Sequence, residues 1–113
     1  MNGHDVMTLT QGYQGLIGIR LEDEEGQSIP DSAVRDVVIT LGPTTRKMTD
    51  EENPVTYDAE EELWMFAVLQ EDTLALDMGV YQLSAKVCFT DDNIVPADIA
   101  AVYVLPTNNK EVV

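Results

Sequence analysis

The sequence is poor in the residues that carry most redox and metal chemistry. It has one cysteine, Cys88, and one histidine, His4, among its 113 residues. A single cysteine excludes an intramolecular disulfide, which fits a reducing compartment or a fold that needs no cross-link. One cysteine and one histidine cannot complete a tetrahedral zinc site. We therefore expect neither a disulfide framework nor a bound metal.

Basic residues are also scarce, with 6 Lys plus Arg against 21 Asp plus Glu and a formal net charge of -15. Such a surface repels nucleic acid and anionic membranes, so we expect neither as a partner. The only basic doublet, Arg46-Lys47, is too small for a nucleic-acid patch and suggests a short strand that faces solvent.

Long hydrophobic runs are absent as well. No apolar stretch approaches the roughly 18 residues that a membrane-spanning helix needs. Residues 1–10 lack the basic region and apolar segment of a secretory signal. These features predict a soluble protein that is made in the cytoplasm.

None of the candidate reactive groups has the neighbours that chemistry requires. His4 stands in a polar N-terminal segment without an orienting partner. Cys88 lies on a predicted strand with no histidine nearby to act as a base, so we expect a small half-buried hydrophobe and not a reactive thiol. Paired carboxylates could serve glycoside hydrolysis only in a cleft that raises one pKa. We expect no catalytic residues, and hence no enzyme.

Ligand-binding motifs are equally weak. Residues 22–25 are four consecutive acids, but adjacent side chains point in different directions, unlike the alternating ligands of an EF-hand loop. A solvated turn with Gly26 at a positive-φ position explains them better, although a bound cation there is left open. The spacing of Gly12, Gly15 and Gly18 matches no nucleotide-binding loop. We expect no cofactor site and no metal site.

The clearest structural pattern in the chain lies between residues 69 and 93. Five apolar residues alternate with polar or small ones, which predicts a strand with one buried face: Tyr81, Leu83, Ala85, Val87 and Phe89. Residues 70–76 suit a helical turn before this strand, and Met78-Gly79 gives a sharp entry. The turn-forming residues 91–93 follow it.

Turn signals about every ten residues separate further short strands, which predicts an all-β antiparallel β-sandwich of about seven strands with one or two helical turns. The other predicted strands are 6–11, 15–21, 34–41, 54–58, 63–69 and 94–105. Pro96 interrupts the last of these, so we expect continuous pairing to begin near Ile99. We expect one domain over residues 1–113, with an ordered core at 6–105 and polar ends at 1–5 and 107–113.

The parity of the strands predicts which side chains fill the space between the sheets. In the 63–69 strand, we assign Trp64 and the residues that alternate with it on the same face to the core, because large aromatic side chains dominate core burial. The predicted core residues are Ile17, Ile19, Val37, Ile39, Trp64, Phe66, Tyr81, Leu83, Val87, Phe89, Val102 and Val104.

Several motifs resemble one known group of proteins. They are Leu69-Gln70-Glu71-Asp72-Thr73-Leu74, Gly79-Val80-Tyr81 with its alternating strand, the turn Thr90-Asp91-Asp92-Asn93, the upstream Gln11-Gly12 and the hairpin from Asp23 to Gly26. Together they resemble the immunoglobulin-like N-terminal domain of phage baseplate upper proteins and related small tailed-phage or prophage structural proteins. The resemblance covers roughly residues 6–105. Asn93 departs from it, since a glycine would be expected in that turn.

The resemblance implies an immunoglobulin-like sandwich without catalytic residues. It implies a non-enzymatic virion structural or assembly module in a phage or prophage, made in the bacterial cytoplasm, whose partners are other virion proteins. Exposed strand edges leave homo-oligomerisation open. The alternative is a small acidic inhibitor that mimics a polyanion and occupies a host DNA-binding protein. The acids cluster in turns and form no evenly spaced row, which disfavours the alternative.

Overall fold

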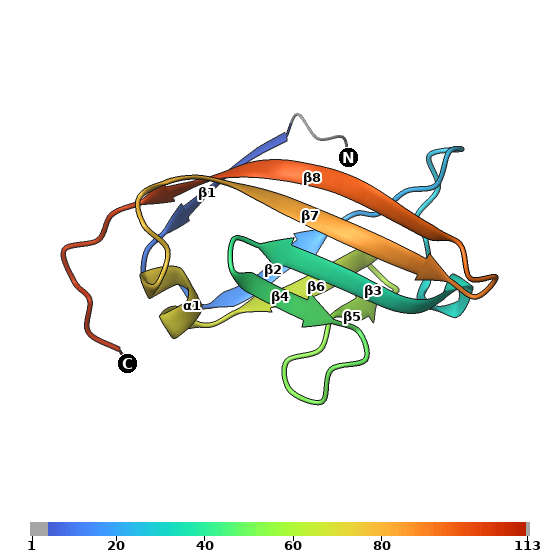
Figure 1. Ribbon diagram of the computed structural model, residues 1–113, viewed down its shortest axis with the longest axis horizontal. Helices are drawn as coiled ribbons and strands as arrows, with labels where there is room; N and C mark the ends of the chain where they lie inside the picture. The colour runs from blue at the N-terminus through green and yellow to red at the C-terminus, as the bar shows by residue number, and fades with distance from the viewer. Residues whose placement is uncertain (1–4, 113) are drawn as a thin grey trace.

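The computed structural model describes residues 5–112 and consists almost entirely of strands (Figure 1). In chain order the elements are β1 (Asp5–Thr10), β2 (Gly15–Ile19), the 3-10 turn η1 (Asp31–Ala33), β3 (Val34–Leu41), β4 (Thr44–Lys47), β5 (Thr56–Asp58), β6 (Leu63–Val68), the helix α1 (Gln70–Leu74), β7 (Gly79–Phe89) and β8 (Ile94–Leu105). The predicted all-β class is confirmed, and the described residues contain eight strands where the sequence suggested about seven.

The strands form two sheets that pack face to face. One sheet has the order β1-β8-β7-β3-β4, and the other has the order β2-β6-β5. The chain crosses between the two sheets several times, since β1, β3 and β7 lie in the five-stranded sheet and β2 and β6 lie in the other. One ladder departs from the predicted antiparallel pattern, because β1 runs parallel to β8. The chain turns at Gly12 and enters the other sheet as β2, so β1 is left to pair with the last strand.

The corner before β7 is held by Tyr81. Its hydroxyl donates a hydrogen bond of 3.1 Å to the backbone carbonyl of Asp77, a local bond of the kind known as a tyrosine corner in β-sandwiches. The ring of Tyr81 also passes close to Gly42, which has φ +56°, and a Cβ there would come within 3.1 Å of the Tyr81 ring. Gly42 is therefore required both by its backbone conformation and by this close approach.

The core lies between the two sheets, and ten of the twelve predicted core residues are buried in it: Ile17, Ile19, Val37, Ile39, Trp64, Phe66, Leu83, Val87, Val102 and Val104. Tyr81 and Phe89 are instead half-buried and pack against the edge of this core. Both lie near the ends of β7, where the opposing three-stranded sheet does not cover them completely. The parity prediction for β6 is correct, since Trp64, Phe66 and Val68 are buried and alternate with half-buried residues.

The prediction that Pro96 delays pairing to Ile99 is wrong. The β7–β8 ladder begins at Cys88 opposite Ile94 and passes through Lys86 opposite Pro96, with an irregularity only beyond Asp98. Proline cannot donate to a ladder, but it is tolerated where its nitrogen faces an open edge. Among the described residues, β1 pairs with β8 only from Ala100 onward, so Pro96 lies on an open edge.

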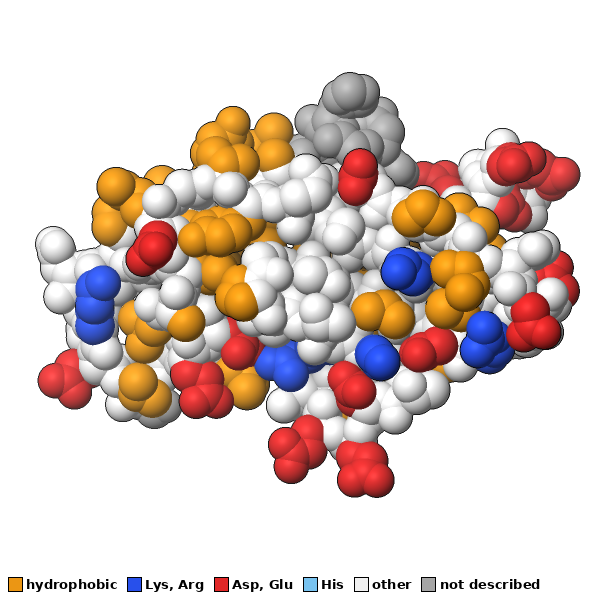
Figure 2. Space-filling model, in the orientation of Figure 1, with side chains coloured by type: hydrophobic (Ala, Val, Ile, Leu, Met, Phe, Trp, Pro, Cys, Tyr) orange, Lys and Arg blue, Asp and Glu red, His pale blue; other side chains and the backbone are white. Residues whose placement is uncertain are grey.

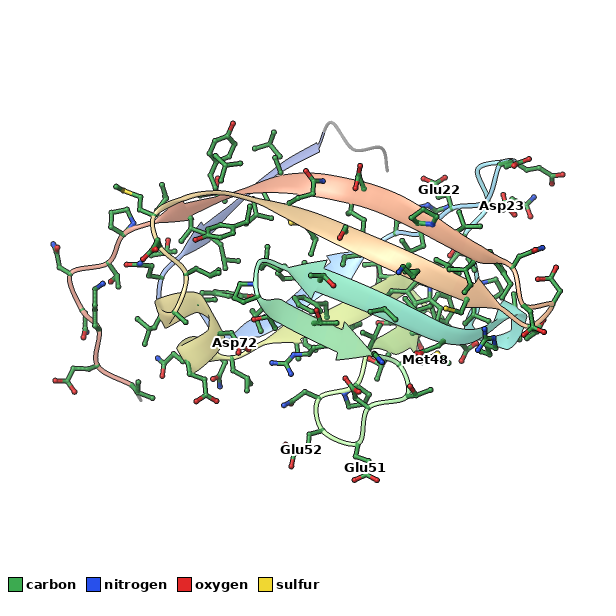
Figure 3. All side chains as sticks on the ribbon, viewed as in Figure 1. Glu22, Asp23, Met48, Glu51, Glu52 and Asp72 are labelled. Carbon is green, nitrogen blue, oxygen red and sulfur yellow. The ribbon has the colours of Figure 1, made fainter. Side chains whose placement is uncertain are left out.

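Arg46 does not face solvent as predicted. Its Nε donates to the Ala67 carbonyl at 2.7 Å and its Nη2 contacts Asp72 Oδ2 at 2.6 Å. The same Asp72 oxygen accepts the backbone N–H of Leu69 at 2.9 Å. Arg46 therefore links the edge strand β4 of one sheet to the end of β6 and to α1, and Figure 3 labels Asp72 at this position.

Replacing Arg46 with alanine should destabilise the domain. The change removes two charge-assisted hydrogen bonds from a side chain that is only 13% exposed, and hydrogen bonds to charged groups each contribute about 1.5–3 kcal/mol. Because both side chains of the ion pair are partly exposed and the two bonds come from one guanidinium, their contributions do not add in full. We expect a loss of about 2–3 kcal/mol in the free energy of unfolding, measured by urea denaturation. The neighbouring Lys47 is exposed, and Lys47→Ala should change this free energy by less than about 0.5 kcal/mol. Equal effects of the two changes would contradict the assignment.

Candidate functional site

The described residues do not assemble a metal-binding cluster. No group of three or more histidine, cysteine or acidic side chains with the placement of a metal site occurs between residues 5 and 112. Cys88 is buried and lies directly opposite Asp36 in the β3–β7 ladder. Its burial limits the access of any reaction partner to the sulfur. His4 lies outside the described residues.

The acidic side chains lie in separate turns and do not converge. In the turn after β2, the Asp23 carboxylate accepts the backbone N–H groups of Glu25 and Gln27, both at 2.9 Å. In the turn before β6, Asp58 accepts backbone N–H groups from residues 60 and 61 in the same way. These carboxylates stabilise their own turns. Figure 3 shows Glu51 and Glu52 on a third loop, on the opposite side of the molecule from Glu22 and Asp23.

The segment that carries the strongest resemblance, residues 69–74, has a structural role. Thr73 is fully buried; its hydroxyl donates to the Tyr13 carbonyl at 2.9 Å and accepts the Gly12 N–H at 3.0 Å. The side chain of Gln11 donates to the Leu76 carbonyl at 2.8 Å. These bonds hold the turn between β1 and β2 against α1, so the motif maintains the fold.

The surface feature that is least expected for a solvated domain is an apolar patch on the outer face of the five-stranded sheet. We name it the sheet-face patch, and it consists of Val6, Val80, Ala101, Tyr103 and Leu105. The ladders place Val80 opposite Tyr103 and Ala101 opposite Val6. Side chains opposite each other on one face of a sheet lie in contact distance. The patch is therefore continuous across β7, β8 and β1.

The sheet-face patch is exposed and carries no charged side chain. Val6 is 61% exposed, Val80 59% and Tyr103 45%. The remaining members of the two cross-strand rows are Thr8 and Gln82, which are neutral. Figure 2 shows hydrophobic side chains gathered where β1, β8 and β7 lie together, whereas most acids lie around the periphery. Contiguous exposed apolar patches are typical of surfaces that contact another molecule.

Sequence reasoning did not select these residues as a site. The alternation in residues 94–105 does place Tyr103 and Ala101 on the face opposite to Val102 and Val104. The apolar character of that outer face was the available signal. Recognising a patch required the register of β1, β8 and β7. β1 and β8 are far apart in the sequence and pair in parallel.

Among the described residues, no helix has the length and apolar character that crossing a membrane requires. No protein-family model matches the chain, and a comparison with curated proteins finds no significant match.

Proposed function

We propose that this chain is a non-enzymatic interaction module of a phage or prophage virion, which binds other structural proteins through the surfaces of its β-sandwich. The observation that carries the binding role is the sheet-face patch, an uncharged apolar surface in a chain with a net charge of -15. The virion setting is supported by the resemblance of residues 69–93 to tailed-phage structural domains.

The charge distribution favours this surface as the contact. Long-range repulsion would oppose the approach of another acidic protein to the loops, whereas the sheet-face patch presents no carboxylate. Apolar burial contributes roughly 25 cal/mol for each Å² removed from water, so an aromatic anchor such as Tyr103 can dominate the binding energy. A polyanion mimic has less support, because the acids occupy separate turns on different sides of the domain.

The sheet-face patch gives a direct test in assembled particles. Tyr103→Asp places a carboxylate at the centre of the patch, and burying an unpaired charge in an interface costs several kcal/mol. We expect the wild-type chain to be present in purified tailed-phage particles of the source strain and the Tyr103→Asp variant to be lost from them, as measured by mass spectrometry.

Thr45→Asp is the matched control, because Thr45 is exposed on the edge strand β4 and the substitution adds the same charge. It should remain in the particles. Both variants should keep the melting temperature of the wild type within a few degrees, since each changes an exposed position. Absence of the wild-type chain from all particles and assembly intermediates would refute the virion setting. Equal retention of both variants would refute the patch as the contact.

A further inference from the structure

One side of the sandwich is not closed by any of the described strands. In the three-stranded sheet, β2 is the outer strand and pairs only with β6. In the five-stranded sheet, β1 covers β8 only from Ala100 to Leu105. The edge of β2 and residues 94–99 of β8 therefore border the same open side.

Two hollows lie along this open side, near the two ends of β2. One has a volume of about 430 Å³ and is lined by β1, Tyr13 and Ile17. The other, which we name the edge groove, has a volume of about 240 Å³ and lies between residues 20–24 and β8. Small-molecule sites commonly measure about 300–1,000 Å³. The edge groove is smaller than that range, a size suited to one or two side chains.

The floor of the edge groove is an uncovered part of the core. Val95 pairs with Val87, and Ala97 pairs with Ala85, so both point toward the core side of their sheet. Their partners are buried, yet Val95 is 48% exposed. Phe89, which has the same parity and lines the same groove, is half-buried. These side chains face inward, and none of the described strands lies over them.

The rim of the edge groove has the opposite character. Four carboxylates, from Glu22, Asp23, Glu24 and Asp98, surround the floor together with the guanidinium of Arg20. Arg20 forms ion pairs with Glu22 at 3.6 Å and with Glu62 at 3.2 Å. Glu24 and Asp98 are exposed. Figure 3 shows Glu22 and Asp23 on the loop beside β8.

We propose that the open side binds an extended segment of a partner protein in which apolar side chains alternate with lysine or arginine. Such a segment would add to the free edge of β2, since an outer strand leaves backbone donors and acceptors unpaired. Its apolar side chains would cover Phe89, Val95 and Ala97, and its cations would meet the exposed rim carboxylates of Glu24 and Asp98. Alternation is required because successive side chains of a strand point to opposite sides.

β8 itself is a poor template for this addition. Pro96 faces the open edge and has no N–H group to donate. A proline on an exposed edge protects a sheet against unwanted pairing. β2 contains neither proline nor a charged residue between Gly15 and Ile19. The backbone contacts are therefore assigned to β2, and β8 contributes side-chain contacts.

The test uses a short dye-labelled peptide in which valine alternates with lysine, and a matched peptide with glutamate in place of lysine. We expect the lysine peptide to bind the intact chain and the glutamate peptide not to bind. In amide NMR spectra the lysine peptide should shift the signals of β2 and of residues 95–98. Two further lysine peptides carry N-methyl groups on alternate backbone nitrogens, one on the odd-numbered residues and the other on the even-numbered residues. We expect one of these two peptides to lose binding, because alternate N–H groups of an added strand face β2. Absence of binding, or shifts confined to other surfaces, would overturn the proposal.

Two double variants distinguish binding at the edge groove from non-specific attraction between a cationic peptide and an acidic protein. Glu24→Lys with Asp98→Lys should weaken binding at least about tenfold, equivalent to about 1.4 kcal/mol. Glu51→Lys with Glu52→Lys makes the same change in net charge on a distant loop and should weaken binding less than about threefold. Ala97→Phe fills the groove without changing charge and should also weaken binding. Equal losses in both double variants would show non-specific attraction and would overturn the proposal.

A second copy of this chain is the competing occupant. Light scattering across a concentration series would show a dimer that Ala97→Phe dissociates, and this result would overturn the assignment to a cationic partner. The edge groove shares no residue with the sheet-face patch. Failure of the peptide experiment therefore leaves the Tyr103→Asp test unaffected, and failure of that test leaves the groove unaffected.

Discussion

Replacing Leu83 with aspartate should unfold the domain, whereas the same replacement at Ser84 should leave it folded. Leu83 is fully buried at the centre of β7, between its neighbours Leu41 on β3 and Ala100 on β8. Loss of its packing alone costs about 2–5 kcal/mol, and an unpaired buried carboxylate costs several kcal/mol more. The sum reaches the entire stability of a typical domain, about 5–15 kcal/mol.

Ser84 is the adjacent residue, and its side chain points to the outer face of the same sheet. It lines a shallow hollow with Thr40, Lys86 and Asp98, so a carboxylate there stays in contact with water. Circular dichroism and amide NMR spectra of the two variants provide the measurement. A folded Leu83→Asp variant, or an unfolded Ser84→Asp variant, would contradict the assignment of Leu83 to the buried face of β7 and of Ser84 to its outer face.

The alternation that supports this prediction was visible in the sequence because β7 has one buried face and one wet face. The same reasoning identified β3 with its observed bounds, Val34–Leu41, and the inward parity of Trp64 and Phe66. Local turn chemistry was also readable: Gly26 has φ +80° as expected. The turn between β7 and β8 needs no glycine at Asn93, because the positive φ of 71° falls on Asp92, a residue type that tolerates this conformation.

The errors arose where the outcome depends on strand neighbours and not on local pattern. Pro96 is compatible with a strand only because its nitrogen faces an edge, and the order of strands in the sheet decides that. Arg46 lies in a polar segment and reads as solvent-exposed, yet it bonds to Ala67 in β6 of the other sheet and to Asp72 in α1. Phe89 has the correct inward parity but lies at the open side, where none of the described strands completes the layer.

The candidate surfaces were least accessible to sequence reasoning for the same reason. Val6 and Tyr103 are nearly a full chain length apart and become neighbours through the parallel β1–β8 ladder. The edge groove combines residues 20–24 with β8, and its acidic run reads as an ordinary solvated turn. The residues that share an exposed sheet surface depend on strand register and on which strands lie at the sheet edges. The residues that fill the core can be identified from the alternation of side chains along each strand.

Trp64→Ala should produce the second largest effect, a loss of about 3–5 kcal/mol in the free energy of unfolding. Trp64 is fully buried, its ring lies 5.0 Å from that of Tyr57, and its indole N–H donates to the Ile29 carbonyl at 2.9 Å. Trp64→Phe keeps an aromatic ring in the core and removes the donor and a smaller part of the ring volume, so it should cost less, about 1–3 kcal/mol. Denaturant unfolding monitored by circular dichroism measures both values.

The two Trp64 variants also test whether a core residue positions the edge groove. Ile29 lines the edge groove, and the Trp64 indole fixes the position of its backbone. Trp64→Phe should therefore weaken binding of the valine–lysine peptide even under conditions where the variant is fully folded, while Thr45→Asp should not. If Trp64→Phe destabilised the domain as much as Trp64→Ala, the hydrogen bond would outweigh the packing. If it left both stability and peptide binding unchanged, the bond to Ile29 would position neither the core nor the groove.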